Sequence, residues 1–193
     1  MSTDPRKVAV LAVDVQNDFC PGGALAVPRG DRVIPVLNDV VARFRGNAVV
    51  YASRDWHPPD TRHFRPFGGP WPVHCVADTP GAELHPDFRL PPNAVIVSKG
   101  QDRADDGYSA FEGTTAQGRT LPDDLRARNI TDLIVGGLAT DFCVRASVLD
   151  ACRAGLNVTV VTDAVAGIDE KGSARALQEM KDAGAQLISS REL

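Results

Sequence analysis

The 193-residue sequence lacks several features that would assign a protein to a special class. It has no apolar run long enough to span a membrane, no internal repeat and no low-complexity tract. Its formal net charge of -4 leaves no basic excess for nucleic acid or an anionic membrane surface. We therefore expect one globular domain over residues 1–193 whose partner is a small molecule, with no nucleic acid and no membrane involved.

Cysteine is also scarce, and its four positions form no C-x-x-C pair and no regular disulfide framework. Residues 1–7 are polar and lead directly into a strand-like run, so no signal peptide is expected. Both observations favour a reduced, cytoplasmic protein. The sequence leaves open whether the protein is a monomer or a homo-oligomer.

Apolar runs alternate with segments of helical periodicity along the chain. Strands are expected over residues 8–13, 48–53, 94–98, 158–161 and 186–189 and in a run that starts at Leu133, and helices over 33–44, 123–128, 144–151 and 171–183. This alternation predicts an α/β fold of three layers, α/β/α, around a central, mostly parallel sheet. The segment from 55 to 93 has no such pattern, and so long a loop in a compact domain is usually functional.

Four of the expected strands lead into a residue that is able to do chemistry. These residues are Asp14, Asp55, Lys99 and Cys143. Ligands of parallel sheets bind at the carboxyl ends of the strands. The four side chains together therefore predict the floor of an active site.

Cys143 is the candidate nucleophile, because a strand, a glycine pair and a Thr-Asp step put it in the first turn of a helix. A helix N-terminus favours the thiolate and offers backbone N–H groups to an oxyanion. Asp14 is the candidate base for the thiol proton, and Lys99 would supply positive charge. The alternatives are a buried structural cysteine and a buried ion pair between Asp14 and Lys99.

All four histidines of the sequence lie in the irregular segment. Asp55 and His57 are two residues apart, so an extended backbone points both to one side, and His63 and His74 can complete the set. One carboxylate and three imidazoles suit one Zn²⁺ ion per chain, and also Mn²⁺ or Fe²⁺. The spacing matches no standard zinc motif, so histidines without a ligand are an alternative, and Cys75 is a rival ligand.

Several short motifs follow one another along the chain. They are Asp14-Val15-Gln16-Asn17-Asp18-Phe19-Cys20, Arg54-Asp55-Trp56-His57 with His63-Phe64, Trp71-Pro72-Val73-His74-Cys75, Ser98-Lys99-Gly100, Tyr108-Ser109-Ala110-Phe111 and Ala139-Thr140-Asp141-Phe142-Cys143-Val144. Together they resemble the nicotinamidases, within the isochorismatase-like hydrolase superfamily. The resemblance implies the isochorismatase-like hydrolase fold, with a metal-binding loop region around residues 54–92.

The resemblance also implies a role for each matched residue. It implies a catalytic triad of Asp14, Lys99 and Cys143, and a metal ion held by Asp55, His57, His63 and His74. It implies an oxyanion hole made by the backbone N–H groups of Ala139 and Cys143, with a cis peptide bond before Ala139. Phe19, Trp71 and Tyr108 match positions that wall a pyridine ring.

The implied reaction is the metal-dependent hydrolysis of nicotinamide to nicotinic acid and ammonia through a Cys143 thioester, a step of NAD salvage. Pyrazinamide would be an analogue substrate, but the sequence departs from some relatives at Phe142, which leaves the preference for such analogues open. One alternative is a superfamily amidase that acts on a carbamoyl or ureido compound, and the Asp55 and histidine cluster argues against it. The other is a metal-binding or redox-sensing module that catalyses nothing.

Overall fold

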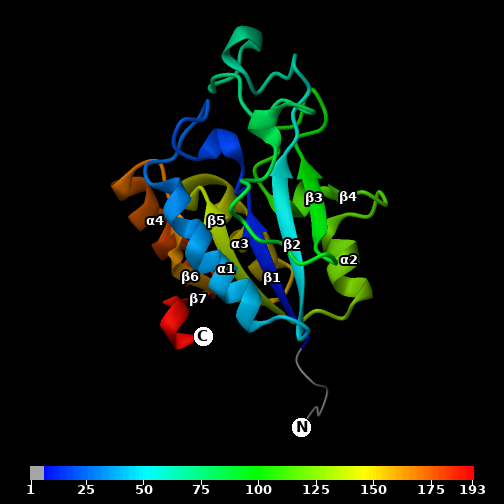
Figure 1. The fold of residues 1–193 in the computed structure, drawn as a ribbon, viewed down its shortest axis with the longest axis vertical. Coiled ribbons are helices and arrows are strands. Elements are labelled where there is room, and N and C mark those ends of the chain that lie inside the picture. Colours follow the sequence, from blue (N-terminus) through cyan, green and yellow to red (C-terminus); the bar gives the residue numbers. More distant parts are fainter. Residues whose placement is uncertain (1–6) are drawn as a thin grey trace.

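The structure is a computed structural model that describes residues 7–193. Residues 1–6, on which most of the signal-peptide expectation rests, lie outside the described part. In the described part, seven strands form one sheet in the order β4-β3-β2-β1-β5-β6-β7 (Figure 1). Their bounds are β1 Val8–Val13, β2 Ala48–Asp55, β3 Val95–Lys99, β4 Thr114–Thr115, β5 Asp132–Leu138, β6 Asn157–Ala166 and β7 Gln186–Ile188.

All strand pairs are parallel except β3 with β4, which is antiparallel. The four helices of the described part are α1 Val33–Arg43, α2 Leu121–Ala127, α3 Arg145–Arg153 and α4 Glu170–Asp182. Buried residues of α1 pack with one face of the sheet, and those of α2, α3 and α4 pack with the other. The predicted three-layer α/β/α fold with a mostly parallel sheet is therefore confirmed.

Several boundaries differ from the prediction. β2 runs on to Asp55 because its last residues still pair with β3, with Asp55 opposite Lys99. β6 continues beyond Val161 to Ala166, because it pairs again with β5 after a register shift. β4 has only two residues, too few to show a periodic pattern. α2 begins two residues earlier than expected, at Leu121, where the Thr120 side chain caps the helix.

The carboxyl ends of β1, β2, β3 and β5 meet at one edge of the sheet. Close contact between β1 and β5 requires glycine at position 137, which has φ of 124° and where a Cβ atom would lie 2.1 Å from the Val13 carbonyl oxygen. The loops after these strands gather above the same edge (Figure 1). This arrangement brings chemically capable residues from distant parts of the chain together.

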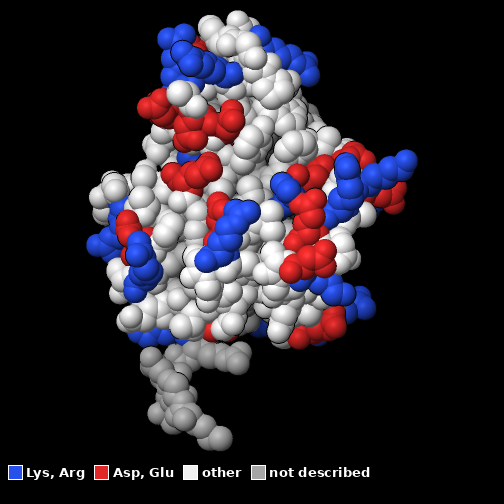
Figure 2. Space-filling view, turned by 180° about the vertical axis from the view of Figure 1, so that it is seen from behind, with Lys and Arg blue, Asp and Glu red and all other residues white. Residues whose placement is uncertain are grey.

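The outer surface carries both signs of charge. On the face shown in Figure 2, acidic and basic side chains are interspersed, and neither sign forms one continuous patch. Among the described residues, no helix is both long and apolar enough to cross a membrane.

Candidate active site

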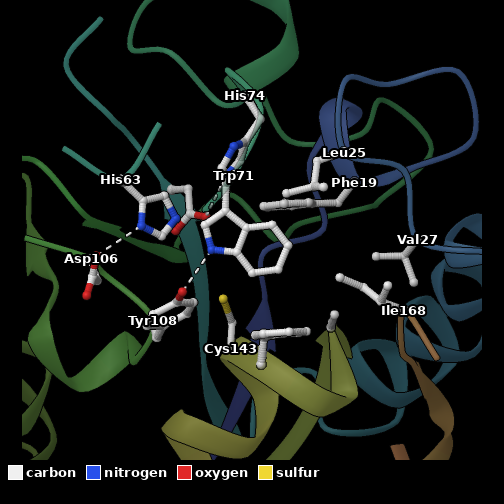
Figure 3. A pocket seen from close by; sticks show the side chains of 13 residues that line it. Phe19, Leu25, Val27, His63, Trp71, His74, Asp106, Tyr108, Cys143 and Ile168 are labelled. Atoms are coloured by element: carbon white, nitrogen blue, oxygen red, sulfur yellow. Dashed lines mark hydrogen bonds and ion pairs between the residues drawn. The ribbon is translucent and has the colours of Figure 1, made fainter. Parts of the chain in front are cut away.

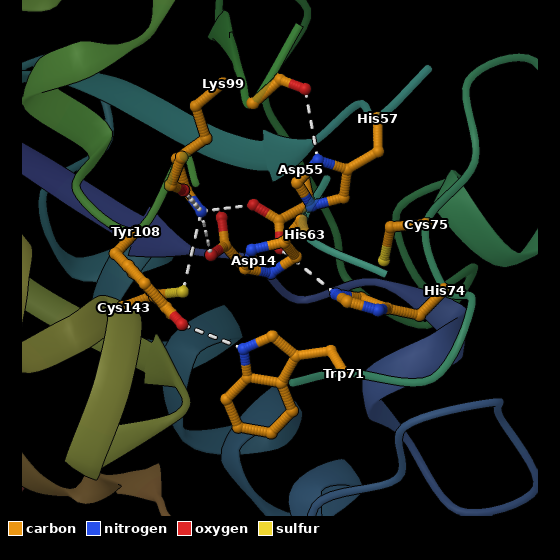
Figure 4. A network of polar contacts seen from close by, with 12 residues as sticks. Asp14, Asp55, His57, His63, Trp71, His74, Cys75, Lys99, Tyr108 and Cys143 are labelled. Atoms are coloured by element: carbon orange, nitrogen blue, oxygen red, sulfur yellow. Dashed lines mark hydrogen bonds and ion pairs between the residues drawn. The ribbon is translucent and has the colours of Figure 1, made fainter. Parts of the chain in front are cut away.

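Asp14, Lys99 and Cys143 meet at the carboxyl edge of the sheet (Figure 4). The Lys99 ammonium lies 2.8 Å from Asp14 Oδ2 and 3.5 Å from Cys143 Sγ. It also donates to Asp55 Oδ1 and, over 2.6 Å, to the Gly107 carbonyl oxygen. The Cys143 sulfur and one carboxylate oxygen from each aspartate lie within 4.8 Å of one another. The structure thus brings the predicted triad together in one buried cluster.

Asp14 is held in an uncommon backbone conformation at the end of β1. Its φ of 49° lies in the left-handed region, which residues other than glycine seldom adopt. Its Oδ1 atom accepts a hydrogen bond of 2.7 Å from the Ser53 hydroxyl, and its own N–H donates to the Ser53 carbonyl oxygen. These contacts aim the carboxylate at Lys99 and at the nucleophile.

Burial and mutual charge set the electrostatics of the triad. Burial raises the pKa of Asp14, although the positive charge of Lys99 acts against this shift. Burial would lower the pKa of Lys99, but the two carboxylates outweigh it and hold the ammonium charged. Burial also raises the pKa of the Cys143 thiol well above its ordinary value.

The expectation that its position in the first helical turn favours the Cys143 thiolate is therefore wrong for the resting site. Loss of water around the sulfur raises the thiol pKa and outweighs the positive charge of Lys99, and Asp14 and Asp55 add negative charge nearby. In this environment the thiol keeps its proton until a base removes it. Asp14, whose pKa is raised, is the carboxylate suited to that task.

The nucleophile lies in a π-helical turn, Thr140–Val144, rather than in a regular first turn of α3. The peptide bond between Leu138 and Ala139 is cis. Ala139 and Cys143, the two residues of the expected oxyanion hole, both line the pocket. The buried Ser147 hydroxyl donates to the Cys143 carbonyl oxygen over 2.7 Å and accepts from the Ala110 N–H, which ties the turn to the loop before β4.

Three of the four histidines converge beside this cluster. The Nδ1 atom of each ring faces a hydrogen-bond acceptor. His57 Nδ1 lies 3.0 Å from the Gly100 carbonyl oxygen, and His74 Nδ1 lies 2.8 Å from the Pro72 carbonyl oxygen. His63 Nδ1 lies 3.2 Å from an Asp106 carboxylate oxygen. Each Nδ1 must therefore carry the proton, which leaves a lone pair on Nε2 of the neutral ring.

These imidazoles fit a divalent metal ion. One nitrogen from each ring lies within 4.8 Å of the others, and the buried Nε2 of His57 has no hydrogen-bond partner. Burial lowers the pKa of His63, and it lowers the pKa of His74 to about 4, so both rings are neutral as metal binding requires. A ring nitrogen fixed by an acceptor on its far side is the usual support for a metal ligand.

Asp55 lies between the histidines and the triad. Its Oδ1 accepts from Lys99, and its Oδ2 lies 3.6 Å from His57 Nε2 and 3.9 Å from His74 Nε2. Burial works against its ionisation, but Lys99 and His57 outweigh burial and keep its pKa low. The buried Gln16 amide holds the Asp55 backbone with hydrogen bonds of 2.8 Å to both its N–H and its carbonyl oxygen. The fourth predicted ligand is thus beside the three histidines.

The other candidates from the sequence do not join this cluster. Among the described residues, the groups whose donor atoms converge do not include Cys75, the rival ligand. His85 lies elsewhere, with its Nδ1 accepting from the Asp87 N–H. All four cysteines are free thiols.

A pocket opens above the sulfur, with about 380 Å³ of empty space, part of which is open to solvent. The predicted wall residues Phe19, Trp71 and Tyr108 all line it (Figure 3). Trp71 Nε1 donates to the Tyr108 hydroxyl over 2.8 Å, and the Trp71 ring meets Phe142 edge-on with centroids 4.9 Å apart.

Sequence reasoning missed four further lining residues: Leu25, Val27, Asp106 and Ile168. Leu25 and Val27 belong to the first motif of the family resemblance, Leu25-Ala26-Val27, but no site role was given to them, and no motif included Asp106 or Ile168. For Asp106, the run of acidic residues after Gln101 was visible, but its contact with His63 depends on how two loops fold together.

Comparisons with known proteins agree with this geometry. The family model described as Isochorismatase domain matches residues 8–192. The chain is 44% identical to the nicotinamidase of Escherichia coli K12, over 94% of each chain. It resembles the crystal structure of Pyrococcus horikoshii pyrazinamidase in complex with zinc, with a TM-score of 0.89, 44% identity and coverage of 95% of this chain and 99% of that one. It also resembles PnC1 from L. infantum in complex with nicotinate, with a TM-score of 0.88, 32% identity and coverage of 99% and 96%.

Proposed function

The chain belongs to the isochorismatase domain family, and from that premise we propose that it is a metal-dependent amidase that hydrolyses nicotinamide to nicotinic acid and ammonia. The observation that carries the proposal is the composition of one pocket. A cysteine lines it, a buried lysine contacts both that cysteine and a buried carboxylate, and three imidazoles whose ring nitrogens converge lie beside this cluster. The aromatic walls suit a flat ring such as pyridine.

In the first half of the reaction, the Asp14 carboxylate takes the proton from the Cys143 thiol, and the sulfur attacks the carboxamide carbon. The backbone N–H groups of Ala139 and Cys143 would hold the oxyanion that forms, and each such donor typically lowers the barrier by about 3 kcal/mol. Asp14 then passes its proton to the leaving nitrogen. The C–N bond breaks, ammonia departs and a thioester remains on Cys143.

In the second half, Asp14 takes a proton from water, and the resulting hydroxide attacks the thioester carbon. The C–S bond breaks, nicotinic acid leaves and the sulfur recovers its proton from Asp14. Lys99 stays charged throughout, because two carboxylates surround it, and it keeps Asp14 oriented toward the sulfur. The aspartate therefore begins and ends each cycle ionised.

His57, His63, His74 and Asp55 would hold the metal ion, with Zn²⁺ as the first choice and Mn²⁺ or Fe²⁺ as alternatives. When bound, the ion would orient the substrate through its ring nitrogen and withdraw electrons from the ring. Because His63 and His74 line the pocket, chelation should weaken substrate binding more than it slows the chemical step.

Ammonia release from nicotinamide by the purified, zinc-loaded protein tests the proposal, run beside Cys143→Ala and a metal-stripped sample. We expect release by the parent and none by the alanine variant, and mass spectrometry of acid-quenched parent should show a nicotinoyl thioester on Cys143. No release from a folded, metal-loaded parent would contradict the assignment and favour a related amidase for a carbamoyl or ureido compound. Pyrazinamide belongs in the same assay as an analogue.

The proposal also covers the pathway and the cellular compartment of the reaction. Nicotinic acid and ammonia as products fit NAD salvage in the cytoplasm, and four cysteines that form no C-x-x-C pair favour that compartment. Isotope-labelled nicotinamide fed to cells with and without the gene tests this part, since the label should reach NAD through nicotinic acid only when the protein is present.

A further inference from the structure

The catalytic pocket has two chemically different ends. The imidazoles of His63 and His74 lie at one end, and the aliphatic side chains of Leu25, Val27 and Ile168 lie at the other (Figure 3). An aliphatic wall offers no hydrogen-bonding group, so it selects a ligand only by the space that it leaves. The aliphatic end is therefore where this pocket sets a limit on substrate size.

Ile168 belongs to two cavities at once. It lines the catalytic pocket, and it also lines an outer groove with about 1220 Å³ of empty space, which lies between the Gly30–Arg32 turn and the start of α4. Ile168 is the residue that the two linings share, whereas Arg32 and Leu177 line only the groove. The Ile168 side chain is thus the partition between the two spaces.

Asp141 holds this partition in place. It belongs to the same turn as Cys143, and its Oδ1 and Oδ2 atoms accept the N–H groups of Ile168 and Asp169 over 3.1 and 3.2 Å. The segment packs tightly, because a Cβ atom at Gly167 would lie 2.9 Å from Asp141 Oδ1. The distance between the nucleophile and the aliphatic wall is therefore fixed through one carboxylate.

We propose that Ile168 determines which ring substituents the enzyme accepts, and that Asp141 is the residue that positions Ile168. The inference rests on the proposed function, in which the carboxamide lies at Cys143 and the ring nitrogen points to the histidines. Ring carbon 5 of nicotinamide faces away from both groups, toward the aliphatic end. The intact enzyme therefore rejects pyridine-3-carboxamides that are substituted at carbon 5, and loss of the Ile168 side chain opens space for them into the outer groove.

The test compares kcat/KM for nicotinamide, 5-methylnicotinamide and 6-methylnicotinamide in the parent, Ile168→Ala and Ile168→Val. The 6-methyl isomer has the same volume but carries its methyl group beside the ring nitrogen, at the histidine end. One methyl group in a closed apolar pocket changes selectivity by about 10- to 200-fold. We expect Ile168→Ala to raise the ratio of 5-methylnicotinamide to nicotinamide at least tenfold, mainly through KM, and to change the 6-methyl ratio less than threefold.

Further variants test whether the shift in the 5-methyl ratio is specific to Ile168. Ile168→Val should shift the 5-methyl ratio in the same direction by a smaller factor, which keeps the test open if the alanine variant does not fold. Arg32→Ala alters the groove alone and should leave the ratio unchanged. Asp141→Ala should shift the ratio as Ile168→Ala does, and Asp141→Asn should shift it less, since its amide retains one of the two acceptor atoms.

The outcomes distinguish this inference from the proposed function. A parent that releases no ammonia from unsubstituted nicotinamide removes the function and this inference with it. A parent that is active, with the 5-methyl ratio unchanged in both Ile168 variants, refutes the partition and leaves the amidase standing. Equal gains for the 5-methyl and 6-methyl isomers would also refute it, because they would indicate a general loosening of the pocket.

Discussion

The contact between His63 and Asp106 makes metal affinity sensitive to one exposed carboxylate. His57 and His74 are oriented by backbone carbonyl oxygens, which no substitution removes, whereas His63 Nδ1 faces an Asp106 oxygen at 3.2 Å. Asp106→Ala removes the acceptor and the charge, while Asp106→Asn keeps an acceptor of similar shape. We expect both variants to bind Zn²⁺ more weakly than the parent, the alanine variant more so.

The size of the effect follows from the exposure of the carboxylate. Loss of a group that orients a metal-bound histidine typically weakens metal binding 10- to 100-fold. The Asp106 side chain is 68% exposed, so solvent screens its charge and the lower end of that range applies. We expect about a tenfold loss for Asp106→Ala, equivalent to about 1.4 kcal/mol, and about a threefold loss for Asp106→Asn.

The dissociation constant of Zn²⁺ can be measured without an activity assay, by letting the metal-free protein compete with a zinc-sensitive dye. Asp102→Asn is the matched control, because it removes the same charge from the same exposed loop, where the Asp102 carboxylate accepts from the Ala104 N–H. An Asp106→Ala variant that binds zinc as tightly as the parent would refute the reasoning. Equal losses in Asp102→Asn and Asp106→Asn would assign the effect to loop charge instead of to the orientation of His63.

Two further predictions concern the triad and the metal site. Ser53→Ala removes a hydrogen bond that lowers the pKa of Asp14. The acidic limb of the pH profile of kcat/KM, measured at saturating zinc, should therefore move to higher pH by about one unit. An unmoved limb would mean that Asp14 is not the base. Gly100→Ala should weaken zinc binding, since its Cβ atom would lie 2.4 Å from the His57 ring. Gly118 also has a positive φ but has open space around it, so Gly118→Ala should leave zinc binding unchanged. Dye competition on both variants checks this, and equal affinities would contradict it.

The sequence predicted the floor of the site because parallel sheets obey a simple geometric rule. Once strands were expected before Asp14, Asp55, Lys99 and Cys143, their carboxyl ends had to share an edge, and the structure brings them together there. The grouping of the histidines depended on the family resemblance instead, since their spacing in an irregular loop fixes no geometry. Strand ends are local in sequence, whereas loop conformation depends on contacts across the whole fold.

The features that the sequence did not reveal all arise from tertiary contacts. The Asp106 contact with His63 and the position of Ile168 depend on how separate loops pack. The protonation state of Cys143 was mispredicted for the same reason. A helix N-terminus is a local feature that favours the thiolate, whereas burial of the sulfur, which raises the pKa of the thiol, is a property of the assembled site.

The two aspartates of the site show how one lysine can serve two functions. Both carboxylates contact Lys99 and both are buried, yet the pKa of Asp55 is lowered and that of Asp14 is raised. Their other neighbours differ, because Asp55 also faces His57, whereas Asp14 accepts from the Ser53 hydroxyl and interacts with the Cys143 thiol. Asp55 therefore stays ionised and is suited to a cation, while Asp14 can exchange a proton during turnover. This difference between two similar carboxylates supports the proposal that Asp14 is the base.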